Sequence, residues 1–149
     1  MAYTLALYLT ELGEYASAHQ LGEDTLTRCR QVLGENHRYT LLSAATLAAA
    51  LGGLGRYEPA RQLGEDTLTR CRRVLGEDHL STLRSATTLA ATLRELGQCE
   101  QARQLAEDTL TRYRRVLGKD HPSTLSSARS LATVLANLGE HDPARRREE

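Results

Sequence analysis

Apolar residues recur along the chain at steps of three and four positions, which is the spacing of one face of an α-helix. One such run extends from Leu83 to Leu96 and is followed by Gly97. A second run extends from Ala102 to Leu117 and is followed by Gly118. Because glycine readily adopts the left-handed backbone angles that end a helix, the two runs predict a pair of helices joined by a short turn.

This pair of predicted helices recurs because the sequence repeats itself every 42 residues. Residues 20–61 and 62–103 are identical at about 30 of 42 positions, and residues 62–103 and 104–145 at about 27. Such repetition is typical of a protein built from copies of one structural unit. The string GEDTLTRCRRVLGEDH at residues 64–79 contains a cysteine and a histidine, but its recurrence indicates a repeated scaffold element and not a single reactive site.

Composition and charge exclude several classes of function. The 149 residues include 19 basic and 19 acidic side chains and neither Trp nor Phe. Nucleic-acid binding would require a clustered basic excess or aromatic stacking surfaces. No apolar run approaches the roughly 18 residues of a membrane helix, and the N-terminal residues lack the features of a signal peptide. Together with an odd number of cysteines, three, these features predict a cytoplasmic protein that binds neither nucleic acid nor membranes.

A specific spacing of leucine, alanine and glycine indicates a known family. The pattern Leu-Ala-x-x-Leu-x-x-Leu-Gly-x-x-x-x-Ala occurs four times, beginning at Leu5, Leu47, Leu89 and Leu131. It resembles the tetratricopeptide repeat. The 42-residue period and the LG-x-DH-x-ST segment between units resemble the kinesin-light-chain type, which also forms sensor arrays in bacterial and fungal signal-transduction ATPases. The resemblance implies an all-α fold, a right-handed superhelix of antiparallel helix pairs with about seven helices.

The repeat predicts the organisation of the chain as a single array. We expect units at about residues 1–37, 38–79 and 80–121, followed by a partial unit at 122–149. The first helix lacks the LGEDH segment that precedes the others, and the last second helix would be a short stub after Asp142. We therefore expect a fragment of a longer protein. The leucines expected in the core are Leu47, Leu51, Leu89, Leu93, Leu131 and Leu135.

The recurring cysteines have a structural explanation. Cys29 and Cys71 fall on the apolar face of predicted second helices, where a small buried side chain fits. Neighbouring packed helices lie roughly 8–10 Å apart, which is beyond the roughly 7 Å limit on the Cα–Cα distance of a disulfide. Cys99 lies near the start of a second helix, where we expect partial exposure.

The recurring histidines also have a structural explanation. His37, His79 and His121 precede the first helices of successive units, about one helix spacing apart. A zinc ion needs ligand nitrogens at about 2.0–2.1 Å, so one ion is not easily shared between them. We expect these histidines to be turn residues that help to begin the next helix. No metal, other cofactor or enzymatic activity is therefore expected.

The resemblance also implies a concave groove, lined by first helices, that binds a peptide or protein segment. The residues assigned to this groove are Leu42, Ala45, Ala49, Gly52, Arg84, Thr87, Ala91, Arg94, Ser126, Arg129, Thr133 and Ala136. They vary between units while the rest of the repeat is nearly constant, and they change from apolar to Arg-containing along the array. Because Arg pairs well with carboxylates, we expect an acidic segment as the ligand.

Self-assembly is the alternative function that the sequence leaves open. Near-identical repeats with open ends can stack end to end, and a head-to-tail contact between copies propagates or closes a ring. In that case the first helix, with Leu5 and Leu9, and the last one, with Leu135 and Leu138, would supply apolar faces for association.

Overall fold

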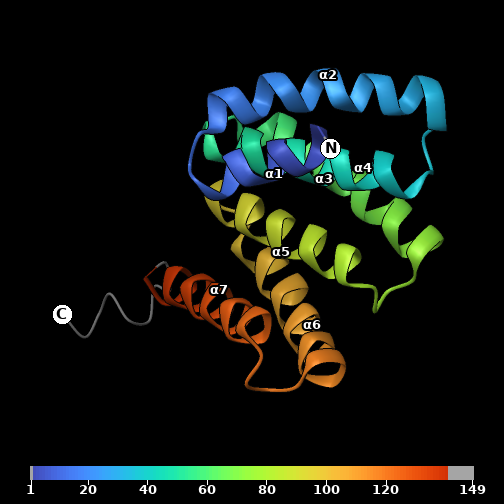
Figure 1. The fold of residues 1–149 in the computed structure, drawn as a ribbon. Coiled ribbons are helices and arrows are strands. Elements are labelled where there is room, and N and C mark those ends of the chain that lie inside the picture. Colours follow the sequence, from blue (N-terminus) through green and yellow to red (C-terminus); the bar gives the residue numbers. More distant parts are fainter. Residues whose placement is uncertain (1, 141–149) are drawn as a thin grey trace.

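Figure 1 shows the computed structural model, which describes residues 2–140. Within this range every regular element is a helix, and no strand is present, as the sequence predicts. The all-α prediction with seven helices is therefore confirmed for the described part of the chain. The helices are α1 (Ala2–Glu11), α2 (Tyr15–Leu33), α3 (Arg38–Gly53), α4 (Tyr57–Leu75), α5 (Leu80–Glu95), α6 (Cys99–Leu117) and α7 (Pro122–Glu140).

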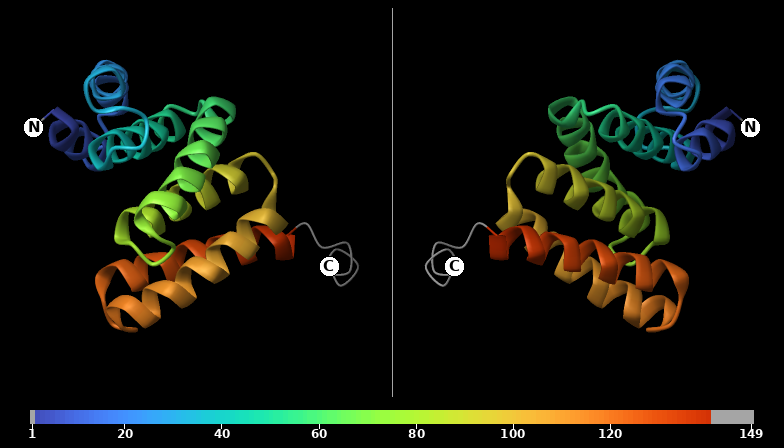
Figure 2. Two further views of the ribbon diagram at one scale, coloured as in Figure 1. Left: turned by 90° about the vertical axis from the view of Figure 1, so that its right-hand side faces the viewer. Right: turned by 90° about the vertical axis from the view of Figure 1, so that its left-hand side faces the viewer.

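The helices form a solenoid of pairs. Each helix packs against the next along the chain, and the first helices of the pairs also pack in order, α1 on α3, α3 on α5 and α5 on α7. Figure 2 shows the pairs fanning out from α1 and α2 at one end to α6 and α7 at the other. Such a stack creates a concave side along the first helices and leaves the second helices on the outside.

The turns lie at the glycines that the pattern predicted. Gly97 has φ 79° between α5 and α6, and Gly118 has φ 87° after α6. At the first of these turns the amide of Gln98 donates to the carbonyl of Leu93 at 2.8 Å, which satisfies an orphan carbonyl at the helix end. The last unit differs, because α7 runs through Gly139 to Glu140. The predicted stub after Asp142 lies outside the described residues.

The recurring histidines cap the first helices. His37, His79 and His121 each accept a hydrogen bond on Nδ1 from the backbone amide two residues later, at 3.2, 3.1 and 3.1 Å. The backbone of His79 is extended, with φ −68° and ψ 138°, as is usual for a residue just before a helix. The expected role of these residues in starting the next helix is thus visible in the geometry.

The core lies between neighbouring pairs. Leu47, Leu51, Leu89 and Leu93 are buried, as predicted. Leu89 clusters with Leu68 of α4, Ala102 of α6 and Val134 of α7, so it joins three successive pairs. A Cβ on Gly64 would lie 3.3 Å from Cδ1 of Leu89, so the missing side chain allows α4 and α5 to approach closely.

Three expectations about burial are wrong. Leu135 is 45% exposed and Leu131 is only partly buried, although both were expected in the core. Their counterparts in α5, Leu93 and Leu89, cluster with Ala102 of the following second helix, whereas no second helix follows α7 within residues 2–140. Cys99 is buried and not partly exposed, because it begins a helix that packs between α5 and α7.

In two of the pairs, polar contacts join the turn before the first helix to the last part of the second helix. Asp78, in the turn before α5, accepts from Arg112 at 2.9 Å and from Arg115 at 2.6 Å, both on α6. The hydrogen bonds from Arg112 and then Arg115 lower the pKa of the Asp78 carboxyl. In the preceding unit the neutral Asn36 accepts from two arginines of α4, Arg70 and Arg73, at 2.9 and 3.3 Å.

Truncation of a central core leucine tests the packing. We expect Leu89→Ala to lower the free energy of unfolding by about 2–5 kcal/mol, because Leu89 is 5% exposed and its removal leaves a cavity. The control is Leu5→Ala at the equivalent position of α1, where the side chain is 51% exposed and the loss should be clearly smaller. Thermal and urea unfolding followed by circular dichroism would measure both, and equal losses would contradict the packing.

A charge at position 36 tests these contacts between the turn and the second helix. Asn36→Asp should raise the melting temperature slightly, because Arg70 and Arg73 would then face a carboxylate, as Arg112 and Arg115 face Asp78. A carboxyl whose folded-state pKa is lowered stabilises above its unfolded-state pKa and loses the effect as pH falls through the folded-state value. The gain should therefore disappear in acid and in high salt. An equal gain in all these conditions would rule out an ionic origin.

Candidate peptide-binding groove

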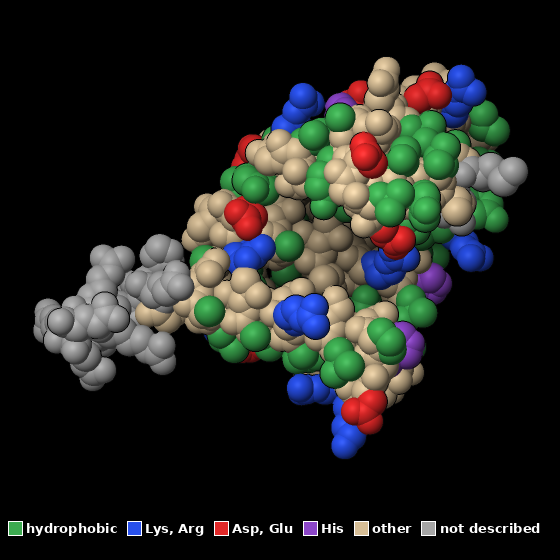
Figure 3. All heavy atoms as spheres, turned by 60° about the vertical axis from the view of Figure 1, so that its left-hand side comes forward, with side chains coloured by type: hydrophobic (Ala, Val, Ile, Leu, Met, Phe, Trp, Pro, Cys, Tyr) green, Lys and Arg blue, Asp and Glu red, His purple; other side chains and the backbone are tan. Residues whose placement is uncertain are grey.

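The concave side of the solenoid is hollowed along its first helices. Three adjoining hollows have volumes of about 240, 360 and 550 Å³. The first two share Ala49, the last two share Thr87, and Thr88 borders all three. Figure 3 shows this face of the molecule, with a central depression and Arg side chains beside it. The shared walls make the hollows one continuous groove that crosses α1, α3, α5 and the start of α7.

Most of the residues assigned to the groove from the sequence line these hollows. Arg84 borders two of them, and Arg94 borders the middle one. Arg129 and Thr133 line none of them and lie further along α7, where Thr133 donates to the carbonyl of Arg129 at 3.1 Å. The assigned residues that line a hollow are Leu42, Ala45, Ala49, Gly52, Arg84, Thr87, Ala91, Arg94 and Ser126.

The lining changes character along the groove. The smallest hollow is bordered by aliphatic side chains of two first helices, among them Leu7 of α1 and Leu42 of α3. The largest is bordered by Arg84, by Glu11 of α1 and by hydroxyl side chains at the start of α7. Arg84 and Thr88 border both of these hollows, so apolar, cationic and hydroxyl-bearing surfaces lie side by side in the groove.

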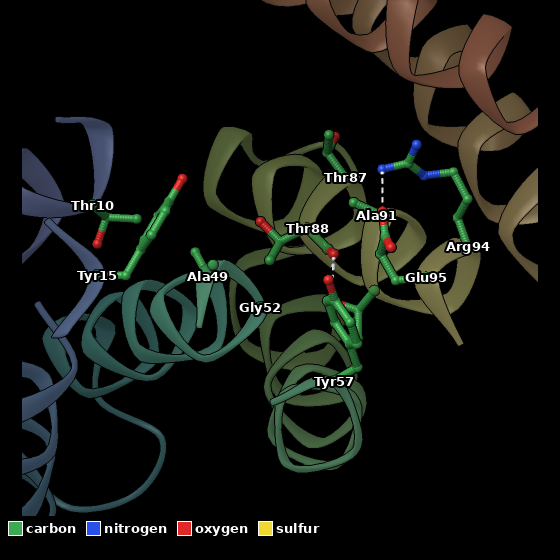
Figure 4. Close-up of a pocket in the computed structure, with 12 residues that line it drawn as sticks. Thr10, Tyr15, Ala49, Gly52, Tyr57, Thr87, Thr88, Ala91, Arg94 and Glu95 are labelled. Atoms are coloured by element: carbon green, nitrogen blue, oxygen red, sulfur yellow. Dashed lines mark hydrogen bonds and ion pairs between the residues drawn. The ribbon is translucent and has the colours of Figure 1, made fainter. Parts of the chain in front are cut away.

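Two tyrosines that border the middle hollow, of about 360 Å³, were not among the groove residues predicted from the sequence. Tyr15 and Tyr57 lie at the start of α2 and α4, at equivalent positions of the repeat, and both border this hollow. In the close-up of Figure 4 both side chains are drawn around it, beside Ala49 and Gly52. The ring of Tyr15 lies so close to the backbone at Gly53 that a Cβ there would overlap it. The recurrence of a tyrosine after 42 residues is the feature of the sequence that could have indicated these two groove residues.

The arginines of the groove are not equivalent. Arg94 pairs with its neighbour Glu95 at 3.0 Å, so its charge is largely balanced within the hollow (Figure 4). Arg84 and Arg129 are exposed, and neither has an ion-pair partner among the described residues. Arg84 lies near the buried Tyr113, whose pKa is raised by burial and lowered in part by a hydrogen bond with Thr87 and by the Arg84 charge. Of these three arginines, Arg84 is thus the one that borders the hollows and has no ion-pair partner among the described residues.

The cysteines do not form a reactive centre. Cys29, Cys71 and Cys99 are all free thiols. Cys71 is buried, with Sγ 3.9 Å from the hydroxyl of Ser85, and burial raises the pKa of its thiol. A raised pKa leaves less thiolate, which is the nucleophilic form. Within the described part of the chain, no three His, Cys, Asp or Glu side chains are grouped so that they could hold a metal ion.

The fold and the groove define a helical-repeat protein of the solenoid class. A sequence profile described as Tetratricopeptide repeat matches residues 2–39, 40–81 and 82–123, and the chain belongs to this family. Tetratricopeptide repeats generally mediate protein–protein interaction or scaffolding, and the fold is typically a non-catalytic module. No curated protein is significantly similar to this sequence.

Two solved structures show the type of repeat. One is a protein described as a kinesin light chain of Podosopora anserina, with nearly identical TPR-like repeats. It has 28% sequence identity and a TM-score of 0.83 over 93% of this chain, which covers 65% of that one. A single-residue variant of the same protein has a TM-score of 0.82 with the same identity and coverage. This chain thus spans less than two thirds of the length of its solved relatives.

The helices of the described residues are also too short or too polar to cross a membrane.

Burial of the thiols predicts their reactivity. In the native protein, iodoacetamide should modify the half-buried Cys29 well before Cys71 and Cys99, because both of these are buried and Cys71 also has a raised pKa. All three should react at similar rates after unfolding in urea. Peptide mapping by mass spectrometry at successive times would give the order, and rapid native labelling of Cys71 would contradict the packing of α4 against α5.

Proposed function

We propose that this chain binds an extended acidic segment of another protein in the groove along its first helices. The observation that carries the proposal is the continuous set of three hollows, in which aliphatic side chains of α1 and α3 lie beside Arg84 and Arg94 of α5. The residues proposed to contact the segment are Leu42, Ala45, Ala49, Arg84, Thr87, Arg94, Arg129 and Thr133.

The aliphatic residues of the groove suit aliphatic side chains of the ligand. Leu42, Ala45 and Ala49 are half-buried, so each retains some apolar surface that a ligand could cover. Burial of apolar area contributes roughly 25 cal/mol per Å² before the entropy of binding is subtracted. The small side chains of Ala45 and Ala49 on α3 also leave room for a ligand side chain to enter between α1 and α5. Thr88 of α5 borders this space.

The cations of the groove suit carboxylates, and Glu11 of α1 is the one acidic side chain that borders a hollow together with Arg84. Arg84 is exposed, borders two hollows and has no ion-pair partner among the described residues, so an incoming carboxylate does not have to displace an existing one. Arg94 would have to share its charge with Glu95, so its net contribution should be smaller. Thr87 and Thr88 supply hydroxyls close to these cations, and Tyr57 supplies a ring face and a hydroxyl.

End-to-end self-association is the second candidate, and exposed leucines support it. Leu5 and Leu12 of α1 are 51% and 59% exposed, and Leu135 of α7 is 45% exposed. In the array, however, a first helix is followed by a second helix before the next first helix begins. Docking α1 of one copy on α7 of another would, among the described residues, reproduce only the contact between first helices and not the contact with a second helix. The groove is therefore the better-supported function.

A synthetic acidic peptide tests the groove proposal. A fluorescent nine-residue peptide of alternating leucine and glutamate should bind, and a matched leucine–lysine peptide should not. Arg84→Ala combined with Arg129→Ala should weaken binding by a few-fold, since an exposed ion pair contributes at most about 1 kcal/mol. Binding should also weaken as salt increases.

The charge-matched control for this experiment is Arg114→Ala, at an exposed position of α6 outside the three hollows. Fluorescence anisotropy would give the dissociation constants. Equal binding of the acidic and basic peptides, or an equal loss in the Arg114 variant, would show that the groove does not select acidic segments.

A further inference from the structure

The largest hollow of the groove, of about 550 Å³, is bordered by two opposite charges that do not pair. Among the described residues that border this hollow, only Arg84 of α5 and Glu11 of α1 are charged. Neither of them has an ion-pair partner within the described part of the chain. The two charged groups therefore border the same space but lie further apart than the partners of an ion pair.

The repeat explains why Glu11 remains unpaired. Its counterpart in α5 is Glu95, which pairs with the residue before it, Arg94, at 3.0 Å. In α1 the residue before the glutamate is Thr10, which carries no charge and donates to the carbonyl of Ala6 at 2.8 Å. The acidic side chain of this hollow is therefore not neutralised by its own helix.

Arg84 is unpaired because its helix offers it no acidic neighbour. Side chains three and four positions apart are the ones that meet on the surface of a helix. At these distances from Arg84 the sequence has Leu80, Ser81, Thr87 and Thr88, none of which is acidic. The charge of Arg84 is therefore not balanced within α5.

The rest of the hollow is neutral and offers hydrogen bonds. Three serines of α7 border it, Ser123, Ser126 and Ser127. Ser127 is only 3% exposed, and its hydroxyl has no hydrogen-bond partner among the described residues. A ligand group that enters the hollow can therefore bond to this hydroxyl without displacing a partner from it.

The two charges make opposite demands on a ligand. A carboxylate is attracted by Arg84 and repelled by Glu11, while a basic group is attracted by Glu11 and repelled by Arg84. A ligand with one acid and one base satisfies both residues. In an extended segment, side chains two positions apart lie on the same side of the chain, roughly 7 Å from each other, so both can enter one hollow.

We propose that the segment bound in the groove carries a basic residue two positions from the acidic residue that pairs with Arg84, and that Glu11 selects this base. The inference rests on the proposed function, because it assigns a charge pattern to the same acidic segment. Glu11 is then a specificity-determining residue, which decides the charge accepted at one position of the segment. The segment is acidic in sum but not at every charged position.

Three fluorescent peptides test the proposal on the full chain. Each has nine residues, with leucine at the odd positions and glutamate at the even ones, except that the fourth residue is glutamate, glutamine or lysine. Fluorescence anisotropy should show that the lysine peptide binds most tightly and the glutamate peptide least tightly. Lysine should improve binding over glutamine by up to about fivefold, because an exposed ion pair adds little to affinity.

Variants of the protein assign this preference to one carboxylate. Glu11→Gln should abolish the preference for lysine, so that the glutamate peptide binds at least as tightly as the other two. Glu14→Gln is the matched control, since Glu14 is exposed, makes no capping hydrogen bond and borders none of the three hollows. Arg84→Ala should weaken all three peptides by a similar factor and keep their order. Glu11 and Arg84 are exposed, so these variants should keep their native circular dichroism.

The outcomes separate this inference from the groove proposal. The inference is overturned if the native protein binds the glutamate peptide as tightly as the lysine peptide, or if the preference for lysine persists in Glu11→Gln. In either case the groove proposal stands as long as Arg84→Ala weakens binding. If none of the peptides binds, or if Arg84→Ala weakens none of them, the groove proposal fails and the inference fails with it.

Discussion

The fold depends on the point where a leucine of one helix pair enters between the two helices of the pair before it. Leu89 of α5 lies beside Ala48 of α3 and beside Ala60 and Gly64 of α4. Larger side chains at these three positions would hold the helices apart and leave the leucine without a site. Every pair provides this site only for its neighbour. Each pair is therefore stabilised by the pairs beside it, and the helices with the fewest neighbours are the least stable. Leu5 of α1, for which no preceding pair lies within the described residues, is accordingly 51% exposed.

The same constraint explains why function is confined to certain faces. Positions that receive or provide the leucine are restricted by packing, and among those named above only the small step from Gly64 to Ala106 occurs between units, whereas the concave side tolerates larger changes. There the units differ in size and charge, from Ala45 in α3 to Thr87 in α5 and Arg129 in α7. A repeat protein can thus keep one scaffold while it changes its ligand, because scaffold and groove use different faces of the same helix.

Much of the fold could be predicted because the periodicity and the repeat agree. The glycine turns follow from local backbone preference, and the buried Leu47 and Leu89 follow from their position on the apolar face. Leu135 was predicted wrongly because a repeat pattern assigns each copy the same environment, whereas burial depends on which neighbours are present. Tyr15 and Tyr57 escaped notice in the groove because they belong to second helices, and only the curvature of the stack brings their rings to the concave side.

The charges of the groove show a further limit of sequence reasoning. A count of arginines treats Arg84, Arg94 and Arg129 alike, yet a neighbouring carboxylate balances Arg94. What a ligand experiences is the charge that remains after such internal pairs form, and this remainder is set by side-chain geometry. Arg84 has no ion-pair partner among the described residues: Thr88 and Ser126 border its hollow, and Glu11 of α1, on the same hollow, does not pair with it. Selectivity for an acidic segment therefore depends less on how many arginines line the groove than on which of them lack a paired carboxylate.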